Sequence, residues 1–170
     1  MTVLESESLI FVGEPGTALC EAPEAIAAIA RGEMVVVVDD ENRENGGDLT
    51  VSVDGTPTHG VTTGISAFDR ATTIALALSG TTDDLQRPGH VFLLVARRGG
   101  LLVRNGRTEA SVDLARLAGC RPAGVIVEII GEHGHLQRLD SLVDFARTHG
   151  LRISSIEKLQ AHLFAQKRAS

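Results

Sequence analysis

The chain has 170 residues, a formal net charge of −6 and neither Trp nor Tyr. This is the length of one ordinary domain, long enough to bury a core without disulfides or a structural metal. The acidic balance argues against sequence-independent nucleic-acid binding, which needs a basic face, and no stretch approaches the roughly 18 apolar residues of a membrane span.

Two further features favour a cytoplasmic protein. Cys20 and Cys120 form no CxxC pair or metal-spacing pattern, which is typical of a reducing compartment. The first residues, MTVLESESLIFVGEPG, lack the basic and then apolar segments of a secretory signal.

Helical and strand patterns alternate along the chain. Residues 1–20 have little pattern and are predicted to form a loosely held arm. The remaining predicted elements, in chain order, are helix 23–30, strands 34–38 and 49–53, helix 66–78, strands 91–96 and 101–103, helix 108–118, strand 125–130, helix 141–148, a short strand at Ile153 and helix 156–167. The run MVVVV at 34–38 is typical of a strand buried on both faces. The alternation predicts an α/β fold: one domain over residues 1–170, with a mixed sheet and flanking helices.

Two polar segments carry candidate binding chemistry. The acidic loop 39–48 follows a predicted buried strand, where α/β proteins place ligands, and its carboxylates suit a divalent cation. A solvated acidic turn fits the same residues. The segment Arg104–Glu109 opens a predicted helix with arginines, a glycine and a hydroxyl, which suits a phosphate. A helix N-cap at Thr108 beside two surface arginines fits equally well.

Two single residues are candidates for acid–base chemistry. His90 follows Pro88 and Gly89, a stiff turn that would hold its ring in place. Glu128 interrupts the apolar run 125–130, and a carboxylate inside a buried strand is costly unless it is paired. The alternatives are that His90 has only a structural role and that Glu128 lies at an exposed strand end.

Five stretches together resemble the 3,4-dihydroxy-2-butanone 4-phosphate synthase family of riboflavin biosynthesis. In the family's order they are VVVVDDENRENGGDL, GVTTGISAFDRATTI, RPGHVFLL, GGLLVRNGRTEASVDLARLAG and PAGVIVEI. The resemblance implies that family's fold and a lyase that converts ribulose 5-phosphate to 3,4-dihydroxy-2-butanone 4-phosphate and formate. It also implies Mg²⁺ as cofactor and a homodimer with active sites near the subunit interface.

The resemblance implies site residues position by position. His90 and Glu128 fall on positions essential for catalysis. In a diverged enzyme Arg107 and Arg104 would stabilise an oxyanion. Glu44 falls on a metal position. The implied substrate-binding positions are Arg43, Asp48, Thr62, Thr63, Asp69, Arg70, Arg104, Gly106 and Thr108.

Three departures from the family separate this chain from its relatives. Gly46 replaces a second glutamate of the acidic loop, and Arg107 replaces a metal-binding histidine. The chain also passes almost at once from Asp48 to Gly60, where the family has roughly two further strand–helix units. Arginine has no lone pair for a metal and stays charged, so Arg107 would repel a cation. We therefore expect no metal, or only weakly bound Mg²⁺.

These departures predict a diverged enzyme that still moves a proton next to a carbonyl. Isomerisation, dehydration or C–C cleavage would follow, on ribulose 5-phosphate or another small hydroxyketone, without a metal and in a specialised pathway. Two alternatives stay open: the parent synthase reaction with an altered metal site, and a non-catalytic anion-binding protein or dimer partner. In each case the ligand is a small phosphorylated or anionic molecule, and a homodimer is expected. Neither nucleic acid nor membrane is an expected partner.

Overall fold

The computed structural model describes residues 9–13, 19–39 and 48–169. The chain forms two compact units. Unit 1 comprises Met1–Gly46 and Ala96–Ser170, and unit 2 comprises Gly47–Val95. The predicted single domain over residues 1–170 stays a prediction.

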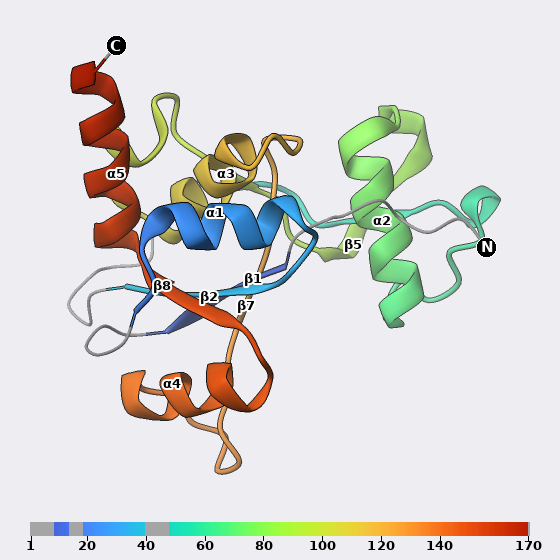
Figure 1. The fold of residues 1–170 in the computed structure, drawn as a ribbon. Coiled ribbons are helices and arrows are strands. Elements are labelled where there is room, and N and C mark those ends of the chain that lie inside the picture. Colours follow the sequence, from blue (N-terminus) through green and yellow to red (C-terminus); the bar gives the residue numbers. More distant parts are fainter. Residues whose placement is uncertain (1–8, 14–18, 40–47, 170) are drawn as a thin grey trace. The chain divides into compact units, whose positions relative to one another are not determined.

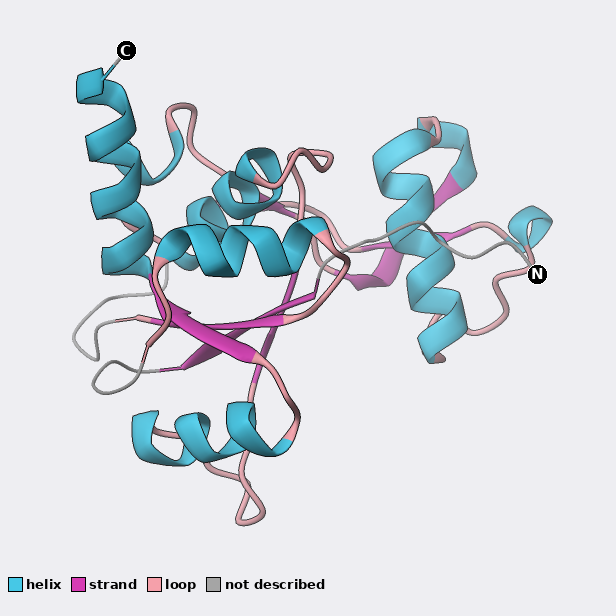
Figure 2. Ribbon diagram, viewed as in Figure 1, coloured by secondary structure: helices cyan, strands magenta, loops and turns pink. Residues whose placement is uncertain are grey.

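A parallel four-stranded sheet forms the centre of unit 1 (Figures 1 and 2). Across the sheet its strands are β7 (Val125–Glu128), β1 (Leu9–Gly13), β2 (Val35–Val38) and β8 (Arg152–Ser155). In β1, Phe11 pairs with Val127 on one side and Val36 on the other. The predicted loose arm is therefore wrong for residues 9–13. A five-residue apolar run has no period that separates an arm from a strand, and its partners lie far away in sequence.

Helices cover both faces of this sheet (Figure 1). Val35 and Val37 of β2 face a core that also contains residues of α1 (Ala22–Ala30), α3 (Arg107–Leu117) and α5 (Ile156–Ala169). Val36 and Val38 face the opposite core, against α4 (Leu139–Thr148). All four valines are buried, which confirms the prediction of a strand covered on both faces. Within the described residues, no helix is both long and apolar enough to cross a bilayer.

The predicted helices of unit 1 are confirmed to within two residues, but the predicted strand at 101–103 is wrong. Gly100–Leu102 instead form a short 3₁₀ turn, η3. Gly99 and Gly100 enter it with φ angles of 98° and 59°, values that disfavour an extended strand. The backbone N–H of Leu101 then donates to the side chain of Asp113 at 2.8 Å, so it is not available to a neighbouring strand.

Unit 2 contains two antiparallel strand pairs and one long helix. The pairs are β3 (Asp48–Leu49) with β6 (Leu94–Val95), and β4 (Val53–Gly55) with β5 (Leu85–Val91); η1 (Pro57–His59), η2 (Thr82–Asp84) and α2 (Ala67–Ser79) complete the unit. The continuous strands predicted at 49–53 and 91–96 are wrong because each is broken into two. The register of β4 against β5 also shifts between Val53 and Asp54.

Helix α2 confirms the predicted helix at 66–78, and a buried threonine ties it to β4. Ser66 is its N-cap, with a side-chain oxygen that accepts from the backbone N–H of Asp69 at 3.0 Å. The buried Thr73 hydroxyl donates to the carbonyl of Asp69 and accepts from the backbone N–H of Gly55 at 2.8 Å. A Cβ at Gly55 would lie 2.8 Å from the side chain of Val61 and 2.9 Å from that of Leu76 on α2, so glycine lets the helix and the strand approach this closely.

Candidate functional site

An arginine joins two carboxylates at the carboxyl edge of the parallel sheet in unit 1. Asp39 directly follows β2, and Glu128 is the last residue of β7. These strands flank β1, so their backbones lie about 10 Å apart. Arg107, in the first turn of α3, spans them: its Nη1 lies 3.3 Å from Glu128 Oε1 and its Nε lies 3.5 Å from Asp39 Oδ2. The arrangement places a fixed positive charge where α/β proteins bind ligands.

The exposure of Glu128 corrects the expectation of a carboxylate inside a buried strand. Strand β7 ends at Glu128, and half of its side chain is exposed. Asp39 is the buried member, with 4% of its side chain exposed. The apolar run continues through Ile130, but the strand pairing stops two residues earlier, so hydropathy alone placed the strand end too late.

A second ion pair lies at the start of the same helix. Glu109 has no exposed surface, and its Oε1 accepts from the backbone N–H of Arg97 at 2.9 Å and from Arg104 Nη1 at 3.3 Å. Its Oε2 is buried and makes no hydrogen bond. Arg104, predicted to bind the phosphate, therefore also neutralises a buried carboxylate.

The N-cap of α3 is Gly106, so the predicted cap at Thr108 is wrong. A Cβ at position 106 would lie 2.5 Å from Glu109 Oε2. Glycine is required there because the buried carboxylate packs directly against the backbone. Thr108 lies inside the first turn, where helical N–H groups have no intrahelical partner and favour an anion.

In unit 2, His90 is held by Asp54. The backbone N–H of His90 donates to Asp54 Oδ1 at 2.9 Å, and His90 Nδ1 lies 2.7 Å from Asp54 Oδ2. Asp54 is buried, whereas about half of the His90 side chain is exposed. Asp54 was not predicted from the sequence, because it directly follows the predicted strand 49–53 and, unlike Glu128, interrupts no apolar run.

The other predicted residues of unit 2 have differing environments. The Asp69 carboxylate accepts from the backbone N–H and the hydroxyl of Thr62, at 3.2 and 3.0 Å, and from the N–H of Gly64. The backbone N–H of Thr62, followed by the other donors, lowers the pKa of Asp69 below its ordinary value. Thr63 and Arg70 are exposed. Asp69 and Thr62 thus already shape the loop that precedes α2.

The structure brings together Arg107 and Glu128, and it adds Asp39 to them. Arg104 pairs with Glu109 on the same helix start. The prediction that His90 and Glu128 form one acid–base pair stays a prediction, because these residues belong to different units. Arg43, Glu44 and the side chain of Asp48 lie outside the described residues.

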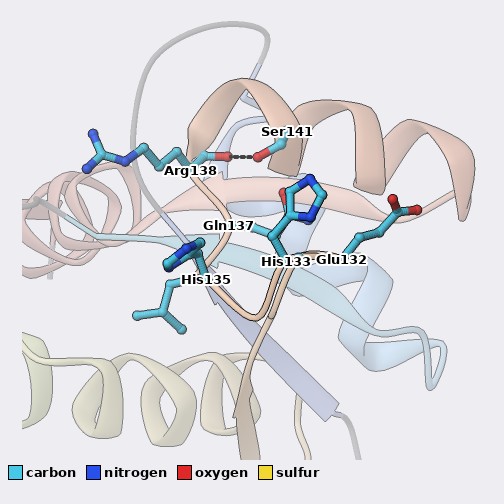
Figure 3. Close-up of a pocket in the computed structure, with 8 residues that line it drawn as sticks. Glu132, His133, His135, Gln137, Arg138 and Ser141 are labelled. Carbon is cyan, nitrogen blue, oxygen red and sulfur yellow. Dashed lines mark hydrogen bonds between the residues drawn. The ribbon is translucent and has the colours of Figure 1, made fainter.

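A separate hollow on unit 1 is open to solvent and contains none of the predicted site residues (Figure 3). It has a volume of about 660 Å³ and is lined by Gly131, Glu132, His133, His135, Leu136, Gln137, Arg138 and Ser141. The segment turns back on itself, with the N–H of Gly131 donating to the carbonyl of His135 at 2.8 Å. The only side-chain bond drawn in Figure 3 joins Ser141 to the Arg138 carbonyl, a local helix-start contact.

Known proteins match this chain over most of its length. The family model described as 3,4-dihydroxy-2-butanone 4-phosphate synthase matches residues 23–55 and 49–162. A protein of that name from Cronobacter sakazakii is 38% identical, over 90% of this chain and 94% of its own length. The riboflavin biosynthesis protein RibBA of Aquifex aeolicus is 43% identical over 80% of this chain. The match covers only 47% of the length of that relative. A solved 3,4-dihydroxy-2-butanone 4-phosphate synthase in complex with two magnesium ions superposes with a TM-score of 0.73 at 31% identity, covering 88% of this chain and 99% of the other.

The alignments contain a long gap in this chain. Against the Aquifex protein the alignment runs over 190 positions, whereas 80% of 170 residues is about 136, so about 54 positions have no counterpart here, close to two strand–helix units. The two matched pieces of the family model meet between residues 49 and 55. The gap therefore lies at the start of unit 2, in agreement with the predicted deletion.

Proposed function

Because the chain belongs to the 3,4-dihydroxy-2-butanone 4-phosphate synthase family, a family of enzymes, we propose that it catalyses the reaction for which the family is named. The substrate would be ribulose 5-phosphate, and the products 3,4-dihydroxy-2-butanone 4-phosphate and formate, in riboflavin biosynthesis. This reading replaces the diverged reaction as the leading hypothesis, since the comparisons support the parent synthase more directly.

The observation that carries the proposal is the 3.3 Å contact between Arg107 and Glu128. It joins two motifs that are 21 residues apart and that the sequence assigned independently to anion binding and to proton transfer. A carboxylate next to a guanidinium can take a proton from a carbon beside a carbonyl while the guanidinium stabilises the enediolate oxygen. The half-exposed Glu128 is accessible to such a substrate.

The start of α3 would bind the phosphate. Thr108 lies in the first helical turn, and Arg104 precedes it with about a quarter of its side chain exposed. Helix N-termini and arginine forks both favour phosphate. His90 would be the second proton-transfer group. In this proposal Thr62, Thr63, Asp69 and Arg70 contribute to substrate binding, as do Arg43 and Asp48 of the acidic loop.

The described residues do not fit a divalent cation beside position 107. Arg107 offers no lone pair, and its guanidinium already contacts the carboxylates of Asp39 and Glu128. Among residues 9–13, 19–39 and 48–169, no three His, Cys, Asp or Glu side chains are grouped closely enough to hold a metal. Because Arg107 stands at the position of a family metal ligand and stays charged, we propose that Mg²⁺ binds weakly or not at all, with Glu44 as the remaining family ligand.

The same contact favours a second candidate function. If the fixed charge of Arg107 replaces a metal, enediol chemistry that needs no chelation, such as isomerisation or dehydration, would survive where formate release is lost. A non-catalytic anion-binding role is the third possibility, and it predicts binding without turnover.

Formate release from ribulose 5-phosphate, measured with Mg²⁺ and with chelator, tests these functions. The proposed function predicts formate, little dependence on Mg²⁺, and a loss of about 10²-fold or more in Glu128→Gln. Glu132→Gln is the matched control, because this exposed glutamate lies outside the predicted site. Turnover of ribulose 5-phosphate without formate would favour the diverged reaction, and sugar-phosphate binding without any turnover would favour the binding protein.

We propose that the active form is a homodimer. Six large apolar side chains of unit 2 are more than half exposed: Leu49, Val51, Ile65, Phe68, Phe92 and Val95. Leu49 and Val51 lie beside the alignment gap, and Ile65 and Phe68 lie at the start of α2. In a homodimer a second copy of the chain would cover these apolar side chains. Light scattering should show a dimer at micromolar concentration, and Phe68→Asp should shift it toward monomer. A wild-type monomer would contradict this proposal.

A further inference from the structure

We propose that Asp39 is a positioning residue: its buried carboxylate holds the Nε end of the Arg107 side chain and so directs the rest of the guanidinium toward Glu128 and the substrate. The proposal rests on the function proposed above for the part that Arg107 plays in turnover. Arg107 stands where the family has a histidine, so the resemblance does not imply this pair. The order of the Arg107 side chain can be measured without any substrate.

The two carboxylates beside Arg107 differ in burial. The Asp39 side chain is 4% exposed and its Oδ2 lies 3.5 Å from Arg107 Nε, whereas the Glu128 side chain is 50% exposed and its Oε1 lies 3.3 Å from Nη1. A buried carboxylate is costly to leave without a cation, but water or a ligand can replace a partner at the surface. Asp39 is therefore the contact that Arg107 keeps, and Glu128 is the one that a substrate oxygen can displace.

The backbone that supports Asp39 is also the stiffer of the two. Asp39 directly follows Val38, which pairs with Gly13 of β1 on one side and with Ser155 of β8 on the other. Glu128 ends the edge strand β7, which among the described strands pairs with β1 alone. A strand held on both sides opens less readily than an edge strand. The carboxylate on the central strand is thus the better anchor for Arg107.

The geometry of the guanidinium turns this anchor into an orientation. Nε faces Asp39 and Nη1 faces Glu128, so neither contact uses the two N–H groups of Nη2. Arg107 Nε is buried and makes no hydrogen bond within the described residues, which leaves the ion pair with Asp39 to fix that end. In the proposed reaction the C–H bond beside the carbonyl breaks and its electron pair enters the enediolate. The proton goes to Glu128, and the Nη groups stabilise the enediolate oxygen.

The competing explanation is that Asp39 only stabilises the end of β2 and does not act through Arg107. Asp39→Asn keeps the shape of the side chain and removes its charge. Made in the wild type and again in Arg107→Gln, it separates the two roles. A residue that acts through Arg107 has little left to contribute once Arg107 is replaced, whereas a structural residue contributes equally in both backgrounds.

The chain offers a matched control in the helix that carries Arg107. Asp113 of α3 is a second buried aspartate, 6% exposed at its side chain, and its Oδ1 lies 2.5 Å from Arg116 Nη1. This pair has no role in the proposed reaction. Asp113→Asn therefore reports the general effect of removing a buried carboxylate from an arginine in unit 1.

NMR of the full chain tests the positioning directly, through the ¹⁵N order parameter of the Arg107 Nε–H group. Arg107→Gln assigns the signal. We expect an ordered group in the wild type, in Asp113→Asn and in Glu128→Gln, and a mobile group in Asp39→Asn. The contrast between the last two variants separates the anchoring carboxylate from the exchangeable one.

Formate kinetics test the consequence for turnover. Asp39→Asn should lower kcat by about tenfold or more, with KM changed less than about threefold. Arg107→Gln should lower kcat by about 10²-fold, and the addition of Asp39→Asn to it should change kcat by less than about threefold. Asp113→Asn should keep the wild-type kcat and KM.

Three outcomes would overturn the proposal: a mobile Arg107 Nε–H group in the wild type, which needs no variant to detect, an ordered group in Asp39→Asn, or an equal loss of kcat from Asp39→Asn in both backgrounds. If the NMR results are as expected but the wild type releases no formate, the positioning role stands and the proposed function fails.

Discussion

The buried pair of Arg104 and Glu109 makes the substitution Arg104→Gln informative about both stability and binding. Glu109 is completely buried, and Arg104 is 27% exposed. Without the guanidinium, the Glu109 carboxylate keeps the hydrogen bond from the backbone of Arg97, while its Oε2 has none. Removal of one member of a buried ion pair typically costs about 3–5 kcal/mol.

The partial exposure and the length of this contact reduce the expected cost. The pair is separated by 3.3 Å, and water reaches Arg104, so we expect Arg104→Gln to lower the free energy of unfolding by about 2–3 kcal/mol. For a chain of 170 residues this corresponds to a fall in Tm of roughly 5–10 °C. The double variant Arg104→Gln, Glu109→Gln should recover part of the loss, because it removes the buried charge.

Urea unfolding followed by circular dichroism measures these values. Arg147→Gln is the control, because Arg147 pairs with Asp144 on the surface of α4 and both are about 70% exposed, so the loss should stay below about 0.5 kcal/mol. If Arg104→Gln is no less stable than Arg147→Gln, the pair does not stabilise the helix start. Weaker sugar-phosphate binding with unchanged stability would leave Arg104 with the binding role alone.

Three further predictions address the metal site, the acid response and the core. Gly46→Glu combined with Arg107→His should raise Mg²⁺ affinity in calorimetry by about tenfold or more, and each single change should do less; tight binding by the wild type would contradict this. The backbone N–H of Thr81 and then the His59 side chain lower the pKa of Asp84 from 3.8 to about 2, so the stability from this carboxylate is present above pH 3.8 and is lost as the pH falls toward 2. Asp84→Asn should therefore flatten the decline of Tm over that interval, and an unchanged decline would show that the contact is not formed. Leu142→Ala should cost about 2–5 kcal/mol in urea unfolding, because Leu142 is fully buried between α4 and the sheet; a loss below about 1 kcal/mol would mean that this core is loosely packed.

The alignment gap lies close to residues that the structure shows in contact with His90. The chain keeps the segment 104–109 and His90, while about 54 aligned positions have no counterpart at the start of unit 2. Asp54 follows that junction closely, and its contact with His90 is intact. The histidine's support thus lies within the part that the chain retains.

The sequence by itself determined the α/β class, the run that becomes the doubly covered strand β2, and the helices at 23–30 and 66–78. These features depend on local spacing and local caps, such as Ser66 before α2, which adjacent residues specify. Sequence also identified the motif residues Arg107, Glu128 and His90, through their chemistry and the family resemblance.

The tertiary structure decided which of these residues meet. Strand β1 joined the sheet because partners more than 20 residues away complete its hydrogen bonds. Arg107 reaches Asp39 and Glu128 only because strand order puts the ends of β2 and β7 on either side of β1. Asp54 holds His90 because strand pairing brings together residues 36 positions apart. Sequence periodicity predicts one helix or strand at a time. The partners of a buried carboxylate come from other elements, so they are set only when the chain folds.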